Sequence, residues 1–159
     1  MLNRWCSIDI DYDKDLLLDI FYKNREQERI YYNIQGNEAQ PISLLNLNND
    51  IHSCIHQLHD KFNYVRDGYY LVSSGYHPHI DDRRTCVITF TLKNEYDVPL
   101  KFYEPDDSVD MSRPFIWNTS VLHGADNSES ERIFYQIELE DDKPYEFYYE
   151  ELTNGSLIR

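Results

Sequence analysis

The chain has little cysteine, and the cysteines that it has show no pairing pattern. Its 159 residues include three of them, Cys6, Cys54 and Cys86, an odd number without paired spacing. The opening stretch Met1–Asp15 also lacks the apolar run of a secretory signal. We therefore expect a cytoplasmic protein whose thiols stay reduced, and no cysteine with a nucleophilic role.

Basic side chains and long apolar runs are also scarce, which argues against two classes of partner. The 29 acidic and 15 basic residues give a formal charge of -14. This charge repels a phosphate backbone and attracts a basic peptide. Arg83 and Arg84 form the single adjacent basic pair, which is weak support for a nucleic-acid patch. No stretch approaches the roughly 18 apolar residues of a membrane-spanning helix. We expect a soluble protein that binds neither nucleic acid nor membrane.

Aromatic residues, by contrast, are plentiful. Fourteen Tyr and seven Phe against two Met indicate the kind of core that strands build more often than helices. The length suits one compact domain, and no repeat or linker divides the chain. We predict a single domain over residues 1–159.

The first third of the sequence predicts both helix and strand. From Asn49, a good N-cap residue, apolar side chains recur at helical spacing, at Ile51, Ile55, Leu58 and Phe62. Strand-like runs at 4–11 and 29–34 flank an apolar cluster at 16–22.

After Gly68 the pattern changes to short strands separated by turn residues, expected at 69–73, 86–92, 99–103, 114–117 and 132–140. In the last of these, Ile133, Tyr135, Ile137 and Leu139 share one face, and Arg132, Phe134 and Gln136 share the other. Segments 103–113 and 124–131 are expected to be loops. The tail after Asp141 has alternating aromatic residues and is expected to form an edge strand or to cover one side of the core. This order predicts a mainly β, α+β fold.

Histidines and carboxylates are concentrated in the segment 76–82. On an extended backbone His77, His79 and Asp81 project from one face, so His79-Ile80-Asp81 can supply two metal ligands. His123 ends another apolar run and can supply a third. Two imidazoles and one carboxylate leave open positions on an octahedral ion, an arrangement typical of non-haem Fe(II).

A cation follows the third candidate ligand at the start of a strand. Arg132 lies nine residues after His123 and could bind the carboxylate of an anionic cosubstrate. The alternatives are ordinary: a His-X-Asp in a surface turn, and an arginine at a strand edge paired with an acidic neighbour.

Together these motifs resemble the 2-oxoglutarate- and Fe(II)-dependent dioxygenases over about Tyr69 to Leu139. The resemblance rests on His79-Ile80-Asp81, the distant His123-Gly124 and Arg132 at the start of the final core strand. Tyr76-His77-Pro78 before the pair, and Arg84-Thr85 leading into the next strand, resemble the prolyl hydroxylase branch.

The resemblance implies a fold, a site and a reaction. The fold would be a double-stranded β-helix, a cupin-like jelly roll, with N-terminal helices packed on the larger sheet. His79, Asp81 and His123 would be the catalytic metal ligands for Fe(II). Arg132 would bind the remote carboxylate of the cosubstrate 2-oxoglutarate, assisted by a hydrogen bond from Tyr76 or Tyr70.

By the same resemblance, O2 would be consumed to hydroxylate an aliphatic C–H bond, with ascorbate as an assay additive. A prolyl side chain in a peptide or protein is the leading substrate, while free amino acids, nucleobases and small metabolites stay open. The sequence leaves the oligomeric state open.

Two departures and several alternatives accompany this interpretation. Phe134 stands where the family often has Ser or Thr, and the short spacing from Asp81 to His123 leaves little room for a substrate lid. A cupin-like set would use His77 instead of Asp81, and a metallo-β-lactamase-like motif would need a histidine at Asp82. A metal-binding protein without oxygenase activity is the rival from another class. The remaining candidates are a second metal site on His52, His56 and His59, and a pocket role for Trp117.

Overall fold

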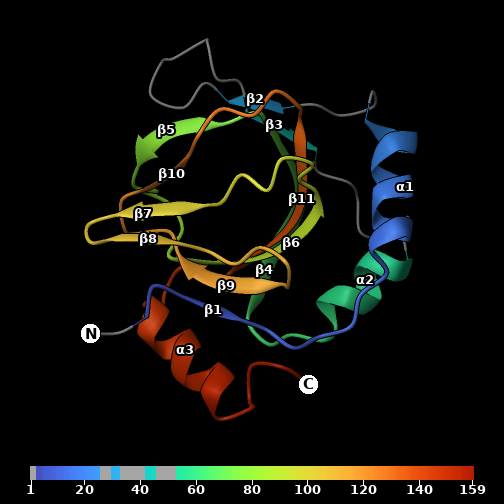
Figure 1. Ribbon diagram of the computed structural model, residues 1–159. Helices are drawn as coiled ribbons and strands as arrows, with labels where there is room; N and C mark the ends of the chain where they lie inside the picture. Colours follow the sequence, from blue (N-terminus) through green and yellow to red (C-terminus); the bar gives the residue numbers. More distant parts are fainter. Residues whose placement is uncertain (1–2, 26–29, 33–41, 46–52) are drawn as a thin grey trace.

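The computed structural model describes residues 3–25, 30–32, 42–45 and 53–159 (Figure 1). These residues form three helices and eleven strands, in the order β1 (Trp5–Ser7), α1 (Lys14–Asn24), β2 (Ile30–Tyr32), β3 (Ile42–Leu45), α2 (Ser53–His59), β4 (Val65–Ser73), β5 (Tyr76–His79), β6 (Cys86–Lys93), β7 (Lys101–Tyr103), β8 (Asp106–Ser108), β9 (Phe115–Asn118), β10 (His123–Ala125), β11 (Arg132–Leu139) and α3 (Tyr145–Thr153). Among the described residues no helix is long and apolar enough to cross a membrane.

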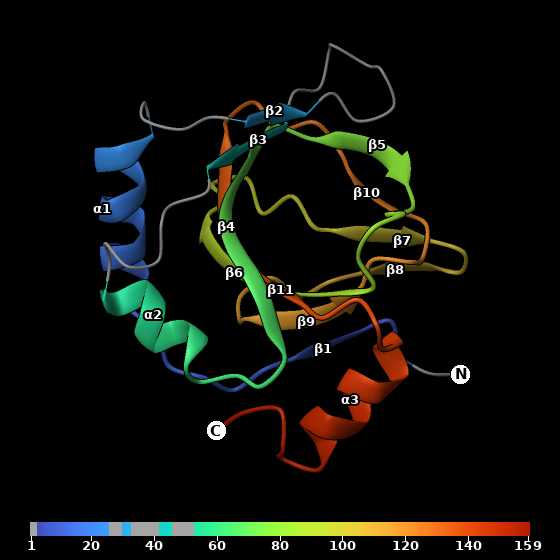
Figure 2. The same cartoon turned by 180° about the vertical axis from the view of Figure 1, so that it is seen from behind.

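The strands form two sheets that face each other. The larger sheet has the order β1-β9-β6-β11-β4-β3-β2, and the smaller one has the order β5-β10-β7-β8. Neighbouring strands run antiparallel throughout the described residues. Figures 1 and 2 show α1 and α2 on the outer face of the larger sheet, and the smaller sheet against its inner face. This arrangement is a double-stranded β-helix, as predicted.

The central strand β11 separates a helix-facing core from the space between the sheets. Its side chains Ile133, Tyr135, Ile137 and Leu139 are buried in the cluster that contains the apolar residues of α1 and α2. Arg132, Phe134 and Gln136 alternate with them and are also buried. The two faces predicted from the sequence are therefore correct.

The helices form where apolar residues meet capping and spacing signals. Asp13 caps α1 by accepting a hydrogen bond from the backbone N–H of Leu16 at 2.9 Å. Leu17, Ile20 and Phe21 of the predicted apolar cluster then fall on the buried face of α1. Helix α2 buries Ile55 and Leu58 as predicted, whereas the expected start at Asn49, with Ile51, lies outside the described residues.

Two predictions for the rest of the chain were wrong. The tail after Asp141 forms helix α3 and no edge strand, because Tyr145 and Tyr148 are buried three residues apart, one turn of helix. It does cover the core, as the alternative had it. The acidic loop expected at 103–113 contains strand β8, which pairs with β7.

Candidate metal centre

Two neighbouring strands of the smaller sheet bring the candidate histidines together. His79 ends β5 and His123 begins β10, and the two residues are direct partners in the antiparallel register. Their ring centroids lie 4.5 Å apart. Both side chains are buried, with exposed fractions of 8% and 1%. The pairing of β5 with β10 therefore places two imidazoles side by side at one end of the space between the sheets.

Backbone carbonyl groups fix the orientation of both rings. The Nδ1 atom of His79 lies 2.9 Å from the carbonyl oxygen of His77, and Nδ1 of His123 lies 2.8 Å from that of Val121. Since a carbonyl oxygen only accepts, Nδ1 carries the proton in each ring. Nε2 of His123 therefore keeps a free lone pair, the usual second-shell arrangement of a metal-binding histidine, while Nε2 of His79 faces the Asp81 carboxylate.

Asp81 completes a group of three possible ligands. Its Oδ1 lies 3.3 Å from Nε2 of His79. One ligand atom from each of His79, Asp81 and His123 lies within 4.8 Å of the others, the single such group that the described residues contain. Two imidazoles and one carboxylate fit non-haem Fe(II).

The electrostatics of Asp81 and His123 favour metal-binding protonation states, whereas for His79 burial is outweighed by hydrogen bonds with Asp81 and the His77 carbonyl, which raise the pKa of its imidazole. Burial opposes the charged form of Asp81, but a hydrogen bond with His79 and the charge of Arg84 outweigh it and lower the pKa of Asp81 to about 2. Burial lowers the pKa of His123 to about 4, and the Asp81 charge offsets this only in part. At neutral pH Asp81 is thus charged and His123 is neutral, the forms in which both groups bind a metal ion.

Arg132 is a buried cation with unused hydrogen-bond donors. It begins β11 on the larger sheet, is 1% exposed, and donates from Nη1 to the carbonyl oxygen of Val98 at 3.3 Å. Its Nε and Nη2 atoms have no partner among the described residues. Because unpaired buried donors on a charged group are costly, this guanidinium fits a site that accepts an anion.

A small cavity lies beside Arg132, and two of its walls contact the metal-ligand group. It measures about 20 Å³, and its walls include Tyr76, Trp117, Arg132 and Met111. The Tyr76 ring lies 5.4 Å from that of His79, and the Trp117 ring lies 4.7 Å from that of His123. Tyr76 and Trp117 thus line the cavity and border the metal-ligand group at the same time.

Phe134, the departure from the family pattern, lies beside Arg132. The guanidinium carbon of Arg132 is 5.6 Å from the centroid of the Phe134 ring. This is a cation–π geometry, which supports the guanidinium without using any of its N–H donors. Phe134 therefore offers no hydroxyl beside the guanidinium of Arg132 and still contacts it.

The structure separates the two candidate tyrosines. Tyr76 lines the cavity, and burial raises its pKa to about 12 against the opposing charge of Arg132, so its hydroxyl keeps its proton. Tyr70 lies on the helix-facing side of β4 and donates its hydroxyl to the carbonyl oxygen of Leu17 at 2.7 Å. The expected contact of Tyr70 with a cosubstrate is thus corrected, because the strand alternation points its ring away from the cavity.

The other candidate histidines lie outside this group. His77 is exposed while His79 is buried, so they do not share a face as expected, and the cupin-like set is not assembled. Asp82 is exposed as well. On α2, His56 pairs with Asp60 at 3.5 Å and His59 hydrogen-bonds the Tyr135 hydroxyl at 2.7 Å; His52 lies outside the described residues.

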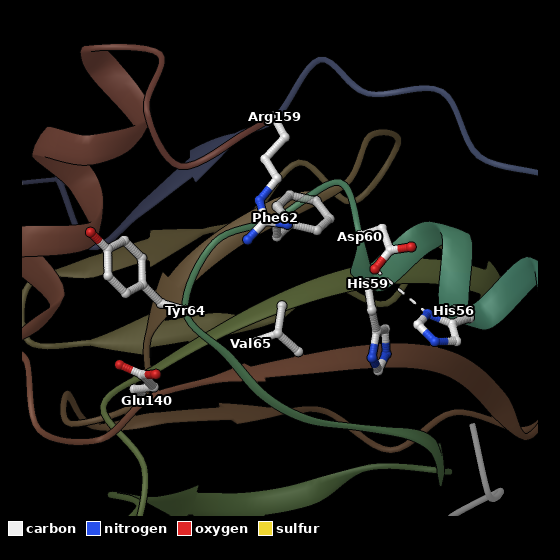
Figure 3. A pocket seen from close by; sticks show the side chains of 8 residues that line it. All are labelled: His56, His59, Asp60, Phe62, Tyr64, Val65, Glu140 and Arg159. Atoms are coloured by element: carbon white, nitrogen blue, oxygen red, sulfur yellow. Dashed lines mark ion pairs between the residues drawn. The ribbon is translucent and has the colours of Figure 1, made fainter. Parts of the chain in front are cut away.

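A second hollow, of about 340 Å³, opens beside α2 and the start of β4 (Figure 3). The side chains that line it come from α2, from the segment that runs from α2 into β4, from the residue after β11 and from the last residue: His56, His59, Asp60, Phe62, Tyr64, Val65, Glu140 and Arg159. None of them belongs to the cavity at Arg132. This hollow is separate from the candidate metal centre.

Sequence reasoning missed the residues that surround the ligands. Met111 and Thr89 line the cavity, and Arg84 pairs with Asp81. Gln136, which the sequence places on one face with Arg132 and Phe134, lines it as well. The period of two in β6 and β11 carried a signal for Thr89 and Gln136, because both fall on the inward face. No spacing in the sequence indicated Met111.

Comparisons with known proteins place this geometry in context. No family model and no curated protein sequence matches the chain. Among solved structures, a prolyl hydroxylase from Trichoplax adhaerens, in complex with a peptide fragment of the hypoxia inducible factor oxygen degradation domain, matches with a TM-score of 0.62 and 12% identity, over 91% of this chain and 87% of that one.

Two further structures match in the same way. The viral collagen prolyl hydroxylase from Paramecium bursaria Chlorella virus-1, in complex with 2-oxoglutarate, has a TM-score of 0.55 and 13% identity, over 86% of this chain and 95% of that one. HygX from Streptomyces hygroscopicus, with nickel and 2-oxoglutarate bound, has a TM-score of 0.54 and 9% identity, over 85% and 82%. Identities this low establish the fold alone. The chain therefore has the double-stranded β-helix fold of the 2-oxoglutarate- and Fe(II)-dependent oxygenases, with a fold similar to that of the prolyl hydroxylases among them.

Proposed function

We propose that the chain is a 2-oxoglutarate- and O2-dependent hydroxylase that uses Fe(II) held by His79, Asp81 and His123. The observation that carries the proposal is the pairing of two features in one space. A buried arginine with unused donors lines a cavity, and two other walls of that cavity, Tyr76 and Trp117, contact His79 and His123 of the metal-ligand group. An acid with one carboxylate for Arg132 and a chelating end for the metal ion would satisfy both.

The residues of the chain would divide the work of binding. The guanidinium of Arg132 would hold the remote carboxylate of 2-oxoglutarate, and the protonated Tyr76 hydroxyl would donate to the same molecule. Trp117 would shield the ligand end from water, since its ring is buried beside His123. Bound Fe(II) would supply the coupling of 2-oxoglutarate decarboxylation to the oxidation of an aliphatic C–H bond.

The size of the cavity bears on how the cosubstrate enters. A volume of about 20 Å³ accommodates about one water molecule and no dicarboxylate. Met111 packs against the apolar residues on both sides of this cavity. Because methionine is unbranched and changes rotamer readily, we expect Met111 to move when 2-oxoglutarate binds.

For the substrate we propose a prolyl or other amino-acid residue of a peptide or protein. The support is the fold similarity to prolyl hydroxylases, one of which was solved with a peptide. The charge of -14 favours a neutral or basic peptide.

A second candidate function is metal binding without oxygenase activity. The small cavity and the absence of a hydroxyl at Phe134 are the observations that favour it. In that case the chain would bind a metal ion and leave Arg132 unused.

The experiment that separates the two adds Fe(II) and then 2-oxoglutarate to the protein without oxygen and follows the visible metal-to-ligand charge-transfer band. We expect a band in the wild type and none in His79→Ala. Arg132→Met should raise the half-saturating 2-oxoglutarate concentration by roughly 10- to 100-fold, the value of charged hydrogen bonds. Arg113→Met removes one charge from an exposed position and serves as the matched control. Bound iron without a band, or equal behaviour of the two arginine variants, would contradict the oxygenase proposal.

A further inference from the structure

Arg84 holds the carboxylate oxygen of Asp81 that faces away from the histidines. Its Nε donates to Oδ2 of Asp81 at 2.6 Å, while Oδ1 lies toward Nε2 of His79 at 3.3 Å. Both partners of this ion pair are well shielded, with side-chain exposures of 21% and 14%. The neighbouring Arg83 is exposed, so the adjacent basic residues of the sequence differ in their surroundings and form no common patch.

The remaining donors of Arg84 reach into the space between the sheets. Its Nη1 donates to the Tyr69 hydroxyl and to Oε1 of Gln136, the latter at 3.3 Å. Tyr69 lies on β4 and Gln136 on β11, next to each other in the register. The larger sheet therefore fixes the guanidinium on the side opposite to Asp81.

The same hydrogen-bond network continues to the other metal ligand. Nε2 of Gln136 donates to Oγ1 of Thr89 at 3.1 Å, and Nε1 of Trp117 donates to the same oxygen at 3.0 Å. The Trp117 ring lies edge-on to His123 at 4.7 Å. Asp81 and His123 are thus connected through side chains of β6, β9 and β11.

Backbone contacts hold the Asp81 loop against the segment that precedes His123. The N–H of Asp81 donates to the carbonyl oxygen of Thr119 at 3.0 Å, and Oγ1 of Thr119 donates to that of Arg84 at 2.5 Å. Thr119 is fully buried. The loop that carries Asp81 and Arg84 is therefore fixed at both residues.

We propose that Arg84 is a positioning residue that occupies Oδ2 of Asp81, so that Asp81 offers the metal ion one oxygen only. This inference rests on the proposed metal site. A carboxylate bound through both oxygens would take an additional position on an octahedral ion. A single oxygen leaves the three positions that a chelating oxo acid and O2 require. Without the guanidinium, Oδ2 is free to rotate toward the ion and close one of them.

The test uses Mn(II) alone, an ion that takes octahedral coordination and whose bound water is counted by water-proton relaxation. Arg84→Gln removes the pairing, Arg84→Lys keeps the charge without the planar fork, and Arg83→Gln is the matched control for net charge. We expect Arg84→Gln to weaken Mn(II) binding 10- to 100-fold, as for other outer-shell partners. The relaxation enhancement per bound ion should fall by roughly one third, because one water is displaced. Arg84→Lys should change both quantities in the same direction by less.

The outcomes distinguish this inference from the proposed function. Failure of the wild type to bind Mn(II) would overturn the metal site itself. A wild type that binds, with affinity and hydration unchanged in whichever Arg84 variant folds, would overturn the role of Arg84. Loss of thermal stability with unchanged hydration would also overturn it, since that is the result of a merely structural ion pair.

Discussion

At the scale of single residues, the structure separates side chains that the sequence leaves equivalent. Tyr70 and Tyr76 were equal candidates for a cosubstrate contact, and Arg83 and Arg84 formed one basic pair. Burial and direction divide both pairs: Tyr76 borders the cavity and Tyr70 contacts α1, while Arg84 meets Asp81 and Arg83 is exposed. These differences depend on which face of a strand a residue occupies, which a sequence fixes only once the strand is placed.

The two tyrosines give the first prediction. Tyr76→Phe should raise the half-saturating 2-oxoglutarate concentration about fivefold, because one hydrogen bond of about 1 kcal/mol is lost. Tyr70→Phe should leave cosubstrate binding unchanged and lower the free energy of unfolding by about 1 kcal/mol, because the buried Leu17 carbonyl loses its donor. The charge-transfer titration and urea unfolding measure the two effects. Reversed roles of the two variants would contradict the assignment.

At the same scale, the four main site residues were predictable and their surroundings were not. His79, Asp81, His123 and Arg132 stand in a recognisable motif order; the structure groups the first three, and Arg132 lines a cavity whose walls Tyr76 and Trp117 contact the two histidines. Their roles stay predictions. The Arg84 pairing and the Met111 wall arise from loops whose path no periodicity records.

At the scale of elements, the pattern of apolar residues predicts long, two-faced strands best. Strand β11 was predicted almost to the residue because both of its faces are buried and alternate in character. The prediction of an edge strand in the tail was wrong because the sequence there fits two periods. Tyr145, Phe147 and Tyr149 alternate as in a strand, yet Tyr145, Tyr148 and Leu152 also have the spacing of a helix. Where both periods fit, packing against the core determines whether the segment forms a helix or a strand.

Packing of α2 on β4 gives a prediction at this scale. Gly68 of β4 leaves no room for a side chain, because an added Cβ would overlap the His59 ring and the Tyr135 hydroxyl. Gly68→Ala should therefore lower the free energy of unfolding by about 1–3 kcal/mol, as overpacking does. The Mn(II) affinity should not change, since the added Cβ would meet His59 of α2 and the Tyr135 hydroxyl on the helix-facing side of β4.

A double-mutant cycle tests the cause of this loss. In the His59→Ala background the same glycine substitution should cost less, because one of the two obstacles is gone. Chemical unfolding of the four proteins measures the difference. An equal cost in both backgrounds would show that the ring is not the obstacle.

At the scale of the whole molecule, net charge and the two-sheet architecture set the context for the site. The chain carries a formal charge of -14, and its jelly-roll fold is the one that the resemblance of its motifs to the oxygenases implies. That residues 1–159 form one domain stays a prediction. Substrate identity could not be predicted, because recognition depends on surfaces and loops that follow no shared pattern.

The charge leads to the last prediction. If the substrate is a peptide, a prolyl peptide with lysines should react with a kcat/KM roughly tenfold above that of an aspartate-bearing counterpart at low salt. The difference should shrink as sodium chloride approaches about 0.5 M, because salt screens exposed charges. Succinate formation with both peptides, and with a neutral one as control, measures it. A preference for the acidic peptide would show that a local field at the site overrides the net charge.

The division of the site between the two sheets has a mechanical consequence. His79 and His123 belong to the smaller sheet and Arg132 to the larger one. A metal ion and an oxo acid bound between them would therefore connect the two sheets. Each turnover would remove the oxo acid and then replace it, so this connection between the sheets would be lost and restored. The two sheets would therefore separate most easily at the moment when product must leave and fresh cosubstrate must enter.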